Sequence, residues 1–283
     1  MSLSDVSETA LFTLFCHALD AKSKQPILND QTAVETIRLI TESFTEQDNK
    51  MHKQLLKGRI DNIVVVHIAL RARYYDEQVL EFVQQHPDAV IINIACGMDN
   101  RFERVDNGQL LFYDLDLPEM IAIKKERFPE QERYKQIGQS VFEPSWMEQI
   151  PKDRKVLLLA EGLFMYCQKE DIQQLLLNLQ EQFPGCEFAF ELFNQFWTRG
   201  WRKPILKVIL HRKLKFGKNA GMTFGLRHGK DIEKWAPGFE FIKEWTYFDT
   251  NHKKIGLYRV LGKLPLLRRT LWTVHYRLNK LSK

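Results

Sequence analysis

The stretch from residue 88 to residue 118 constrains the fold more than any other part of this 283-residue chain. Its sequence is DAVIINIACGMDNRFERVDNGQLLFYDLDLP. A continuous apolar run over 90–94 is typical of a parallel strand that is covered on both faces. Gly97 follows at a sharp turn, and a second apolar run covers 110–113. The pattern predicts a strand–helix–strand unit that binds its ligand at the carboxyl ends of the strands.

Two acidic residues, Asp114 and Asp116, close the second apolar run. A carboxylate at this place can hold a ribose by its hydroxyls. The loop over 95–101 lacks the G-x-G-x-x-G pattern of a pyrophosphate site, and Asp99 would repel a phosphate but suit a cationic ligand. S-adenosylmethionine has a ribose, an ammonium and a sulfonium, and no phosphate. The alternative is a plain strand–helix–strand unit with an incidental glycine and a solvated acidic turn.

Several short motifs along the chain together carry a family resemblance. They are S-E-T-A at 7–10, the segment 30–33, R-A-R at 71–73 with Asp76, the loop with Gly97, Asp99 and Arg101, D-L-P at 116–118 with Lys124, E-G-L-F-M-Y at 161–166, and a weaker W-A-P-G at 235–238. The chain resembles the leucine carboxyl methyltransferase family, and more closely its bacterial branch of polyketide-synthesis O-methyltransferases. Ala95 departs from the pattern, because the family has its first glycine there.

The resemblance implies an α/β fold of the Rossmann-like class I methyltransferase type. We expect a mostly parallel sheet with an antiparallel last strand, N-terminal helices and a helical insertion or lid. One domain is expected over 1–283, made of an N-terminal helical cap (1–58), a cofactor-binding core (59–192), a basic lid (193–237), and the last strands with a basic C-terminal helix (238–283).

The resemblance also implies which residues bind S-adenosylmethionine. They are Arg71, Arg73, Ala95, Gly97, Asp99, Asp116, Leu117, Ser140, Val141 and Glu161. One arginine, Arg71 or else Arg73, is expected to pair with the carboxylate of the cofactor, and Glu161 to lie near its ammonium. Tyr166 is the catalytic candidate, since it could reach the acceptor, but its ring could equally serve only for packing. Lys124 could equally be a surface lysine.

Hydrophobic periodicity and helix caps predict the remaining elements. Helices are expected over 5–22, after Asp30, over 59–85, from Pro118 to Arg127 and over 168–182. Strands are expected over 134–137, 155–160 and 187–192. A short helix and a strand are expected within 231–248, then a last strand from Ile255 to Leu261 in an antiparallel hairpin, and a basic helix from Leu264 to Leu281.

The net charge of +5 is unevenly distributed. Residues 199–219 hold eight Lys or Arg and no acid, and residues 262–283 hold six and no acid. The first segment suits a lid over the acceptor, a contact with an anionic membrane, nucleic-acid binding or a solvated face. Nucleic acid is not expected as a partner, because the rest of the chain is acidic. A peripheral membrane contact through both segments stays open.

The sequence shows no secretory signal and no apolar run long enough to span a bilayer. Four scattered cysteines fit a reducing compartment better than disulfides or a zinc site, so a cytoplasmic protein without a metal is expected.

The predicted reaction is the transfer of a methyl group from S-adenosylmethionine to a hydroxyl or carboxyl of a small, polyketide-like acceptor, with S-adenosylhomocysteine as product. A carboxylate needs no base, whereas a phenol or alcohol would need one, for which Tyr166, His17 and His67 are candidates. The alternatives are a protein carboxyl methyltransferase, a nucleic-acid methyltransferase, and an inactive protein that binds the cofactor, which Ala95 would permit.

Overall fold

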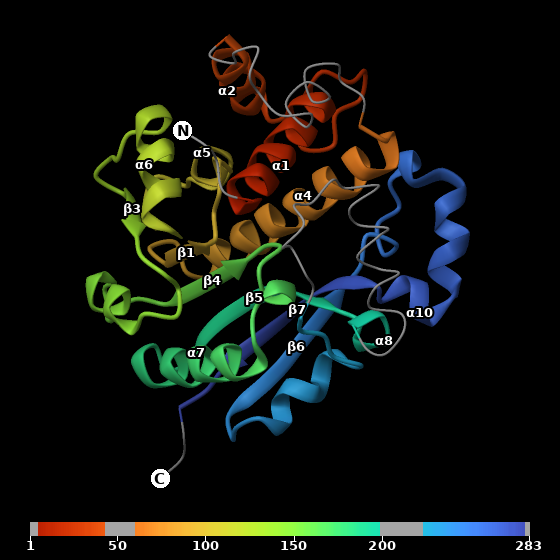
Figure 1. Ribbon diagram of the computed structural model, residues 1–283. Helices are drawn as coiled ribbons and strands as arrows, with labels where there is room; N and C mark the ends of the chain where they lie inside the picture. Colours follow the sequence, from red (N-terminus) through yellow and green to blue (C-terminus); the bar gives the residue numbers. More distant parts are fainter. Residues whose placement is uncertain (1–4, 43–59, 199–222, 281–283) are drawn as a thin grey trace.

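The computed structural model describes residues 5–42, 60–198 and 223–280 of the chain. Within these residues a seven-stranded sheet lies between layers of helices (Figure 1). The strands follow the order β3-β2-β1-β4-β5-β7-β6. They are β1 (Val90–Ile94), β2 (Leu111–Asp116), β3 (Tyr134–Gly138), β4 (Val156–Ala160), β5 (Cys186–Phe193), β6 (Phe239–Trp245) and β7 (Leu271–Leu278). Strands β1 to β5 pair in parallel, and β7 pairs antiparallel with both β5 and β6. The predicted class of sheet is confirmed.

Helices cover both faces of this sheet (Figure 1). One layer contains α1 (Asp5–Ala21), α2 (Gln31–Glu42), α4 (Asn62–Gln85), α5 (Arg101–Val105) and α6 (Pro118–Arg127), and the other contains α7 (Lys169–Gln182). In β1, Ile91 packs into the first layer, while Val90 and Ile92 pack into the second. Successive residues of a strand point to opposite faces, so a strand covered on both sides is apolar throughout.

Short helices complete the described chain. They are η1 (Pro144–Gln149), η2 (Phe164–Tyr166), α8 (Gln195–Thr198), η3 (Gly229–Lys234), η4 (Lys253–Lys263) and α10 (Pro265–Arg268). The predicted short helix and strand within 231–248 correspond to η3 and β6. The region 199–222, which contains most of the predicted lid, lies outside the described residues.

The predicted starts at Asp30 and Pro118 agree with the structure, whereas α4 begins at Asn62 and not at residue 59. The side chain of Asp30 accepts a hydrogen bond from the backbone of Ala33 at 2.9 Å and so caps α2. Asp61 caps α4 in the same way, and α6 opens on Pro118, which needs no amide partner there. α1 and α4 pack against each other at the carboxyl ends of the central strands.

The end of the chain was predicted wrongly. We expected a helix over 264–281, but Leu271–Leu278 form β7. The sequence LWTVHYRL alternates in the manner of a strand, and Trp272, Val274, Tyr276 and Leu278 all enter the core. The basic residues around this segment favoured a surface helix, but burial of the alternating apolar side chains decides the structure.

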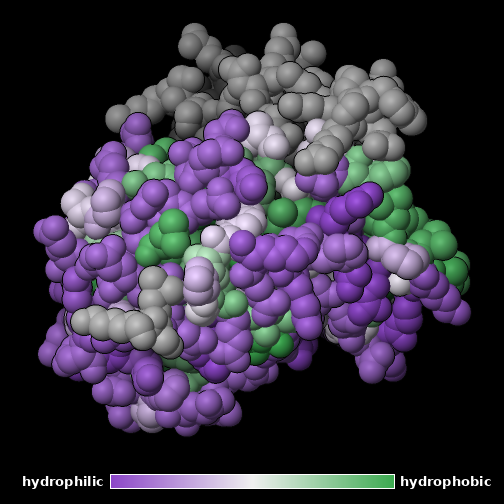
Figure 2. All heavy atoms as spheres, turned by 90° about the horizontal axis from the view of Figure 1, so that it is seen from below, coloured by the Kyte–Doolittle hydropathy of each residue, from purple (hydrophilic) through white to green (hydrophobic). Residues whose placement is uncertain are grey.

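The expected last strand over 255–261 is also wrong, because this segment belongs to η4. Of its side chains only that of Ile255 is buried, and Gly256 interrupts the helix with a φ of +54°. Leu257, Tyr258 and Val260 are exposed instead. The face of the protein seen from below is largely hydrophilic, with hydrophobic atoms gathered toward its right-hand edge (Figure 2).

No helix among the described residues is long and apolar enough to cross a membrane. All four cysteines are unpaired thiols, as the sequence predicted. A cytoplasmic location stays a prediction.

Candidate active site

A cavity of about 480 Å³ lies between the carboxyl ends of the central strands and the helices α1 and α4. Its wall includes one side of each helix, the loop that follows β1, the end of β2 and the turn that follows β4. The volume is typical of pockets for small molecules and cofactors. The position is the one at which open α/β sheets bind their ligands.

The loop after β1 turns sharply under α1. Ala95 and Gly97 have φ angles of +51° and +52°, in the left-handed region that favours glycine. A Cβ atom at Gly97 would lie 2.9 Å from the Cβ of Ala10, so only glycine fits against α1. Ala95 keeps the backbone conformation that the family's first glycine would supply, at the cost of some strain.

The carboxylate of Asp116 is held in place by this loop. It accepts hydrogen bonds from the backbone of Gly97 at 2.7 Å and from the backbone of Leu117 at 2.8 Å. Burial raises the pKa of Asp116, and the two backbone donors partly offset that rise. The side chain reaches the cavity wall at the end of β2, where a ribose would be expected.

Arg101 is buried beneath the cavity and connects three elements. Its guanidinium donates to Asp76 at 2.7 Å, to Asn93 at 3.0 Å and to Glu161 at 2.7 Å. A buried charge is tolerated only with such partners. Arg101 therefore ties α4, β1 and the turn after β4 together below the ligand space.

Arg71 projects from α4 between two carboxylates. Its Nε donates to Glu161 at 2.7 Å, and its Nη1 donates to Glu191 at 3.1 Å. Burial alone would raise the pKa of Glu161, but Arg71 and Arg101 together lower it below the ordinary value. Among the described residues Glu191 has only Arg71 as a positive partner, so its burial, together with the charge of Glu161, raises its pKa to about 7.

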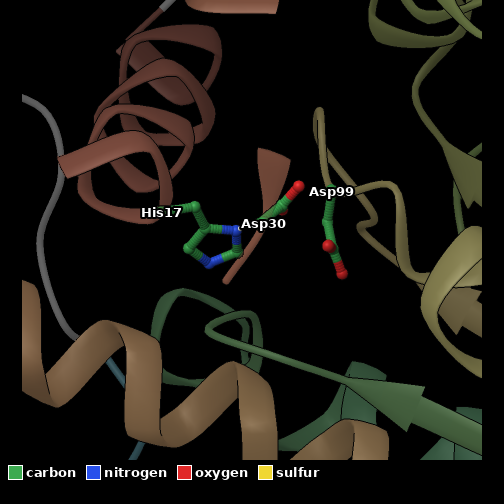
Figure 3. Close-up of side chains that lie close together, drawn as sticks. All are labelled: His17, Asp30 and Asp99. Atoms are coloured by element: carbon green, nitrogen blue, oxygen red, sulfur yellow. Dashed lines mark hydrogen bonds and ion pairs between the residues drawn. The ribbon is translucent and has the colours of Figure 1, made fainter. Parts of the chain in front are cut away.

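A third arginine, Arg104, contacts the carboxylates nearest α1. It lies 3.1 Å from Asp30, 2.7 Å from Asp76 and 2.8 Å from Asp99. His17, Asp30 and Asp99 come close enough together to suggest a metal site (Figure 3). The guanidinium of Arg104 already bridges the two carboxylates of this group, so a cation occupies the place that a metal would take.

The charges of this connected network do not balance. Asp30, Asp76, Asp99, Glu161 and Glu191 supply five carboxylates, whereas Arg71, Arg101 and Arg104 supply three guanidinium groups. With all of them ionised the sum is −5 + 3 = −2. An excess of negative charge beside a cavity favours a cationic ligand.

The other side of the cavity is largely apolar. Its wall contains Phe12, Val64, Ile68, Leu163, Met165, Tyr166 and Leu271. Burial raises the pKa of Tyr166 to about 12, so its phenol stays protonated at neutral pH. Burial and the charge of Arg71 lower the pKa of His67 to about 3, and its ring lies 4.2 Å from that of Tyr247. Both side chains are therefore neutral.

Comparison with known proteins identifies the family. The model of the leucine carboxyl methyltransferase family matches residues 10–180. The chain is 30% identical over 249 residues to the tetracenomycin polyketide synthesis O-methyltransferase TcmP of Streptomyces glaucescens, covering 88% of this chain and 85% of TcmP. The chain belongs to the leucine carboxyl methyltransferase family. The predicted family and the predicted methyltransferase are thereby confirmed.

Two further relatives of this methyltransferase agree. The chain is 27% identical over 281 residues to the S-adenosyl-L-methionine-dependent methyltransferase dpfgK of Gibberella zeae, covering 96% of this chain and 92% of dpfgK. Among solved structures, a proposed methyltransferase from Thermobifida fusca superposes with a TM-score of 0.58 at 12% identity, over 94% of both chains. The similarity to the Thermobifida fusca structure, at 12% identity, shows the fold alone.

The cavity of the methyltransferase brings together most of the predicted site residues. Arg71, Ala95, Gly97, Asp99, Asp116, Glu161 and Tyr166 all contribute to its wall. Their roles toward a ligand stay predictions.

Four predicted residues lie elsewhere. Arg73 is half exposed and pairs with Glu77, and Leu117 is exposed at the start of α6. Val141 packs in the hydrophobic core, and the hydroxyl of Ser140 accepts a hydrogen bond from the backbone of Phe142. None of the four contributes to the cavity wall in the described part of the chain.

Some residues had a different place from the one predicted. β2 continues to Asp116, so Asp114 lies inside the strand and not at an exposed tip. It forms a buried ion pair of 2.8 Å with Lys124, which is therefore not a surface lysine. Burial alone would lower the pKa of Lys124, but Asp114 raises it, so Lys124 stays charged.

Two functional residues were missed because no local pattern marks them. Glu191 lies inside the apolar strand β5, and Arg104 follows Arg101 on α5 at a spacing typical of many helices. Only the approach of α4 to both elements shows that the two residues belong to the network. A carboxylate among the apolar residues of β5 was a weak sequence signal for Glu191.

Proposed function

We propose that this methyltransferase transfers the methyl group of S-adenosylmethionine to an oxygen of a small, largely apolar acceptor. The observation that carries the proposal is the division of the cavity. Three acidic residues, Asp99, Asp116 and Glu161, line it at the strand ends, whereas apolar residues of α1, α4 and the segment 163–166 form much of the remaining wall. The first suits a cationic nucleoside, and the second suits an apolar molecule that receives the methyl group.

The residues present fit the cofactor. Two backbone donors hold the carboxylate of Asp116 in place at the end of β2. A carboxylate fixed in this position can accept hydrogen bonds from the ribose hydroxyls. The network, in which carboxylates outnumber guanidinium groups, suits a ligand that carries a sulfonium and an ammonium. When bound, S-adenosylmethionine supplies a methyl group on a good leaving group, so the protein's own task is binding and orientation.

The apolar side would hold the acceptor next to that methyl group. Orienting two reactants in this way can lower a barrier by roughly 7–11 kcal/mol. An acceptor carboxylate is already ionised, whereas a hydroxyl has to lose a proton. Tyr166 lies in this wall as a neutral phenol and suits a hydrogen bond to the acceptor better than proton abstraction. The relation to TcmP favours a polyketide-like acceptor over a protein carboxyl group.

The first test is calorimetric titration with S-adenosylmethionine, S-adenosylhomocysteine and, as a control, NADH. We expect micromolar binding of the first two, none of NADH, and loss of binding in Asp116→Ala. Asp88→Ala is the matched control, since Asp88 is exposed at the opposite end of β1. If the protein bound none of the three compounds, the proposal would be refuted.

The second test concerns the acceptor. Purified protein is incubated with S-adenosylmethionine and 1-naphthol, 2-naphthoic acid or a peptide with a C-terminal leucine, and mass spectrometry follows methylation. Mild alkali cleaves a methyl ester but not an aryl ether, so it separates the two kinds of oxygen. Methylation of the peptide alone would support a protein carboxyl methyltransferase. Cofactor binding without turnover on a broad acceptor panel would support an inactive binding protein.

A peripheral membrane contact is a separate proposal about partners. Leu257, Tyr258, Val260, Leu261 and Leu264 have exposed fractions between 40% and 89%, and Arg259 and Lys263 lie among them. Exposed apolar side chains beside basic ones suit an anionic lipid surface. The protein should co-sediment with phosphatidylglycerol vesicles and should stay in the supernatant with phosphatidylcholine vesicles. Equal sedimentation with both, or with neither, would contradict the contact. The segment 199–219, also predicted to take part, lies outside the described residues.

A further inference from the structure

The connection between β6 and β7, residues 246–270, leaves and rejoins the fold at the cavity wall. Near its start, the ring of Tyr247 lies 4.2 Å from the ring of His67, which lines the cavity. Directly after its end, Leu271 lines the same cavity. Between these points Ile255 packs in a buried cluster on the first half of α4 (Figure 1). The connection therefore borders the apolar side of the cavity, where the acceptor is proposed to bind.

Beyond Ile255 the connection turns its apolar side chains outward. Gly256 interrupts η4 with a φ of +54°, and no residue from 257 to 264 is buried. Apolar residues recur in this segment at spacings of three and four, which places them on one side of a helix. Such a gathering of exposed apolar side chains marks an interaction site. We call it the η4 face, and it consists of Leu257, Tyr258, Val260, Leu261 and Leu264.

The charges around the η4 face indicate what covers it. Residues 251–264 contain four basic side chains and no acidic one. Lys254 lies 3.4 Å from Asp20, whereas Lys253, Arg259 and Lys263 form no ion pair with any described residue. A second copy of the chain, docked on this face by two-fold symmetry, would bring like charges together. An anionic bilayer instead accommodates both the apolar side chains and the cations, and it is the occupant that this face fits.

A bilayer on the η4 face would lie next to the wall that receives the acceptor. On that side the wall is formed by apolar residues such as Val64, Ile68 and Leu271. A molecule that moves from lipid to such a wall keeps its hydrocarbon part out of water, and exposing that part to water would cost free energy. The arrangement favours an acceptor that is dissolved in the bilayer, and it offers no advantage to a freely soluble one.

We propose that the methyl acceptor is a membrane-dissolved amphiphile, with a hydrocarbon tail and a hydroxyl or carboxyl head, which reaches the cavity from an anionic bilayer docked on the η4 face. This inference rests on the proposed function, since it assumes methyl transfer from S-adenosylmethionine in this cavity. The head oxygen forms a bond to the methyl carbon as the carbon–sulfur bond breaks and its electron pair stays on sulfur. A carboxylate head needs no proton transfer, and a hydroxyl head releases its proton to water.

The experiment follows a deuterated methyl group from S-adenosylmethionine into cell extracts. The full-length protein is incubated either with the water-soluble extract of the source organism or with its chloroform extract reconstituted into vesicles. Mass spectrometry should find the label in a chloroform-soluble product. Phosphatidylglycerol vesicles should give at least about tenfold faster labelling than phosphatidylcholine vesicles, because each unpaired cation adds to the attraction of an anionic surface.

Variants of exposed residues test the role of the η4 face. Leu257→Asp combined with Val260→Asp should slow labelling of the lipid product by at least about tenfold, while calorimetry shows an unchanged affinity for S-adenosylmethionine. Leu177→Asp is the matched control, since Leu177 is 39% exposed on α7, and it should keep the wild-type rate. Arg259→Gln combined with Lys263→Gln should remove the preference for phosphatidylglycerol, a change that a purely structural role would not produce.

The other outcomes separate this inference from the proposed function. Failure of the wild-type protein to bind S-adenosylmethionine would refute the proposed function itself. Cofactor binding with label only in the water-soluble extract, or in neither extract, would overturn the lipid acceptor alone. Equal labelling with both kinds of vesicle, or an unchanged rate in the double aspartate variant, would overturn delivery through the η4 face. A lipid-free dimer that this variant converts to a monomer in analytical ultracentrifugation would assign the face to a second copy and overturn the inference.

Discussion

The guanidinium of Arg71 donates to the carboxylate of Glu161 at 2.7 Å, although ninety positions separate the two residues in the chain. The same guanidinium reaches Glu191 at 3.1 Å. One residue of α4 thus neutralises charge at the ends of two neighbouring strands, β4 and β5. The stability of the fold and the electrostatics of the cavity depend on the same side chain.

Removal of Arg71 should therefore destabilise the protein strongly. In Arg71→Met two buried carboxylates lose a partner, and breaking a buried pair in this way costs about 3–5 kcal/mol of unfolding free energy. Arg71→Lys keeps the charge but cannot reproduce both contacts, so about 1.5–3 kcal/mol should be lost. Urea denaturation measures both values.

Arg73→Met is the matched control for this series. Arg73 is on the same helix but is half exposed and pairs with Glu77, so its removal should cost at most about 1 kcal/mol. Equal losses at positions 71 and 73 would show that the buried contacts of Arg71 are not what stabilises this region.

The loop after β1 offers a second test. Ala95 has a φ of +51°, which costs an L-residue roughly 1–2 kcal/mol, while glycine there would add about 0.4–1 kcal/mol of unfolded-state entropy. Ala95→Gly should therefore raise the unfolding free energy by up to about 1.6 kcal/mol. Gly97→Ala should lower it, because the new Cβ would lie 2.9 Å from that of Ala10. Thermal denaturation compares the stabilities of the two variants. If Ala95→Gly lost as much unfolding free energy as Gly97→Ala, the strain assigned to Ala95 would be contradicted.

The buried pair of Lys124 and Asp114 gives a third prediction. Lys124→Met leaves the Asp114 carboxylate buried, with Tyr134 and Asn93 as its side-chain donors among the described residues, and should cost about 3–5 kcal/mol of unfolding free energy. Adding Asp114→Asn removes the unpaired charge and should recover part of this loss. A double-mutant cycle from urea denaturation measures the coupling.

The neighbouring residue Lys125 is the control for that cycle. It is about half exposed and lies 3.3 Å from Glu130, so Lys125→Met should change the unfolding free energy by less than about 1 kcal/mol. Strict additivity of Lys124→Met and Asp114→Asn would show that the two charges do not stabilise each other.

Sequence patterns predicted the parallel half of the sheet because each of its features is local. The apolar run of β1, the turn at Gly97 and the proline that opens α6 each follow from residues that are close together in the chain. Asp116 was found in the same way, since it ends a strand next to a glycine loop.

The antiparallel half was harder to predict because its signals conflict. β7 combines an alternating apolar pattern with basic residues that are equally common on surface helices. The pattern prevails because pairing with both β5 and β6 buries Trp272, Val274 and Tyr276 in the core. An isolated segment cannot show that two neighbouring strands are available to it.

The charged network could not be predicted for a related reason. Family motifs marked Arg71, Asp99 and Glu161 as ligand contacts, but the structure shows that arginines and acids from α4, α5, the start of α2 and the strand ends also bind one another. Which acceptors remain for a ligand depends on contacts between residues far apart in the chain.

The pH dependence of stability should show two opposing contributions. Burial first, and then the charge of Glu161, raises the pKa of Glu191 from 4.5 to about 7. The folded protein therefore binds this proton more strongly than the unfolded chain, and the contribution is lost as pH rises from about 4.5 to 7. Burial, with Arg71, lowers the pKa of His67 from 6.5 to about 3, so its contribution is present above 6.5 and is lost as pH falls toward 3.

Single substitutions should separate these contributions. Relative to the wild-type protein, Glu191→Gln should gain unfolding free energy as pH rises from 4.5 to 7, by on the order of 3 kcal/mol. Relative to the wild-type protein, His67→Gln should lose unfolding free energy as pH rises from 3 to 6.5. Urea denaturation at several pH values gives both differences, and comparison with the wild type removes the titration of all other groups. Differences that do not change with pH, or that change in the same direction for both variants, would contradict the assigned environments of Glu191 and His67.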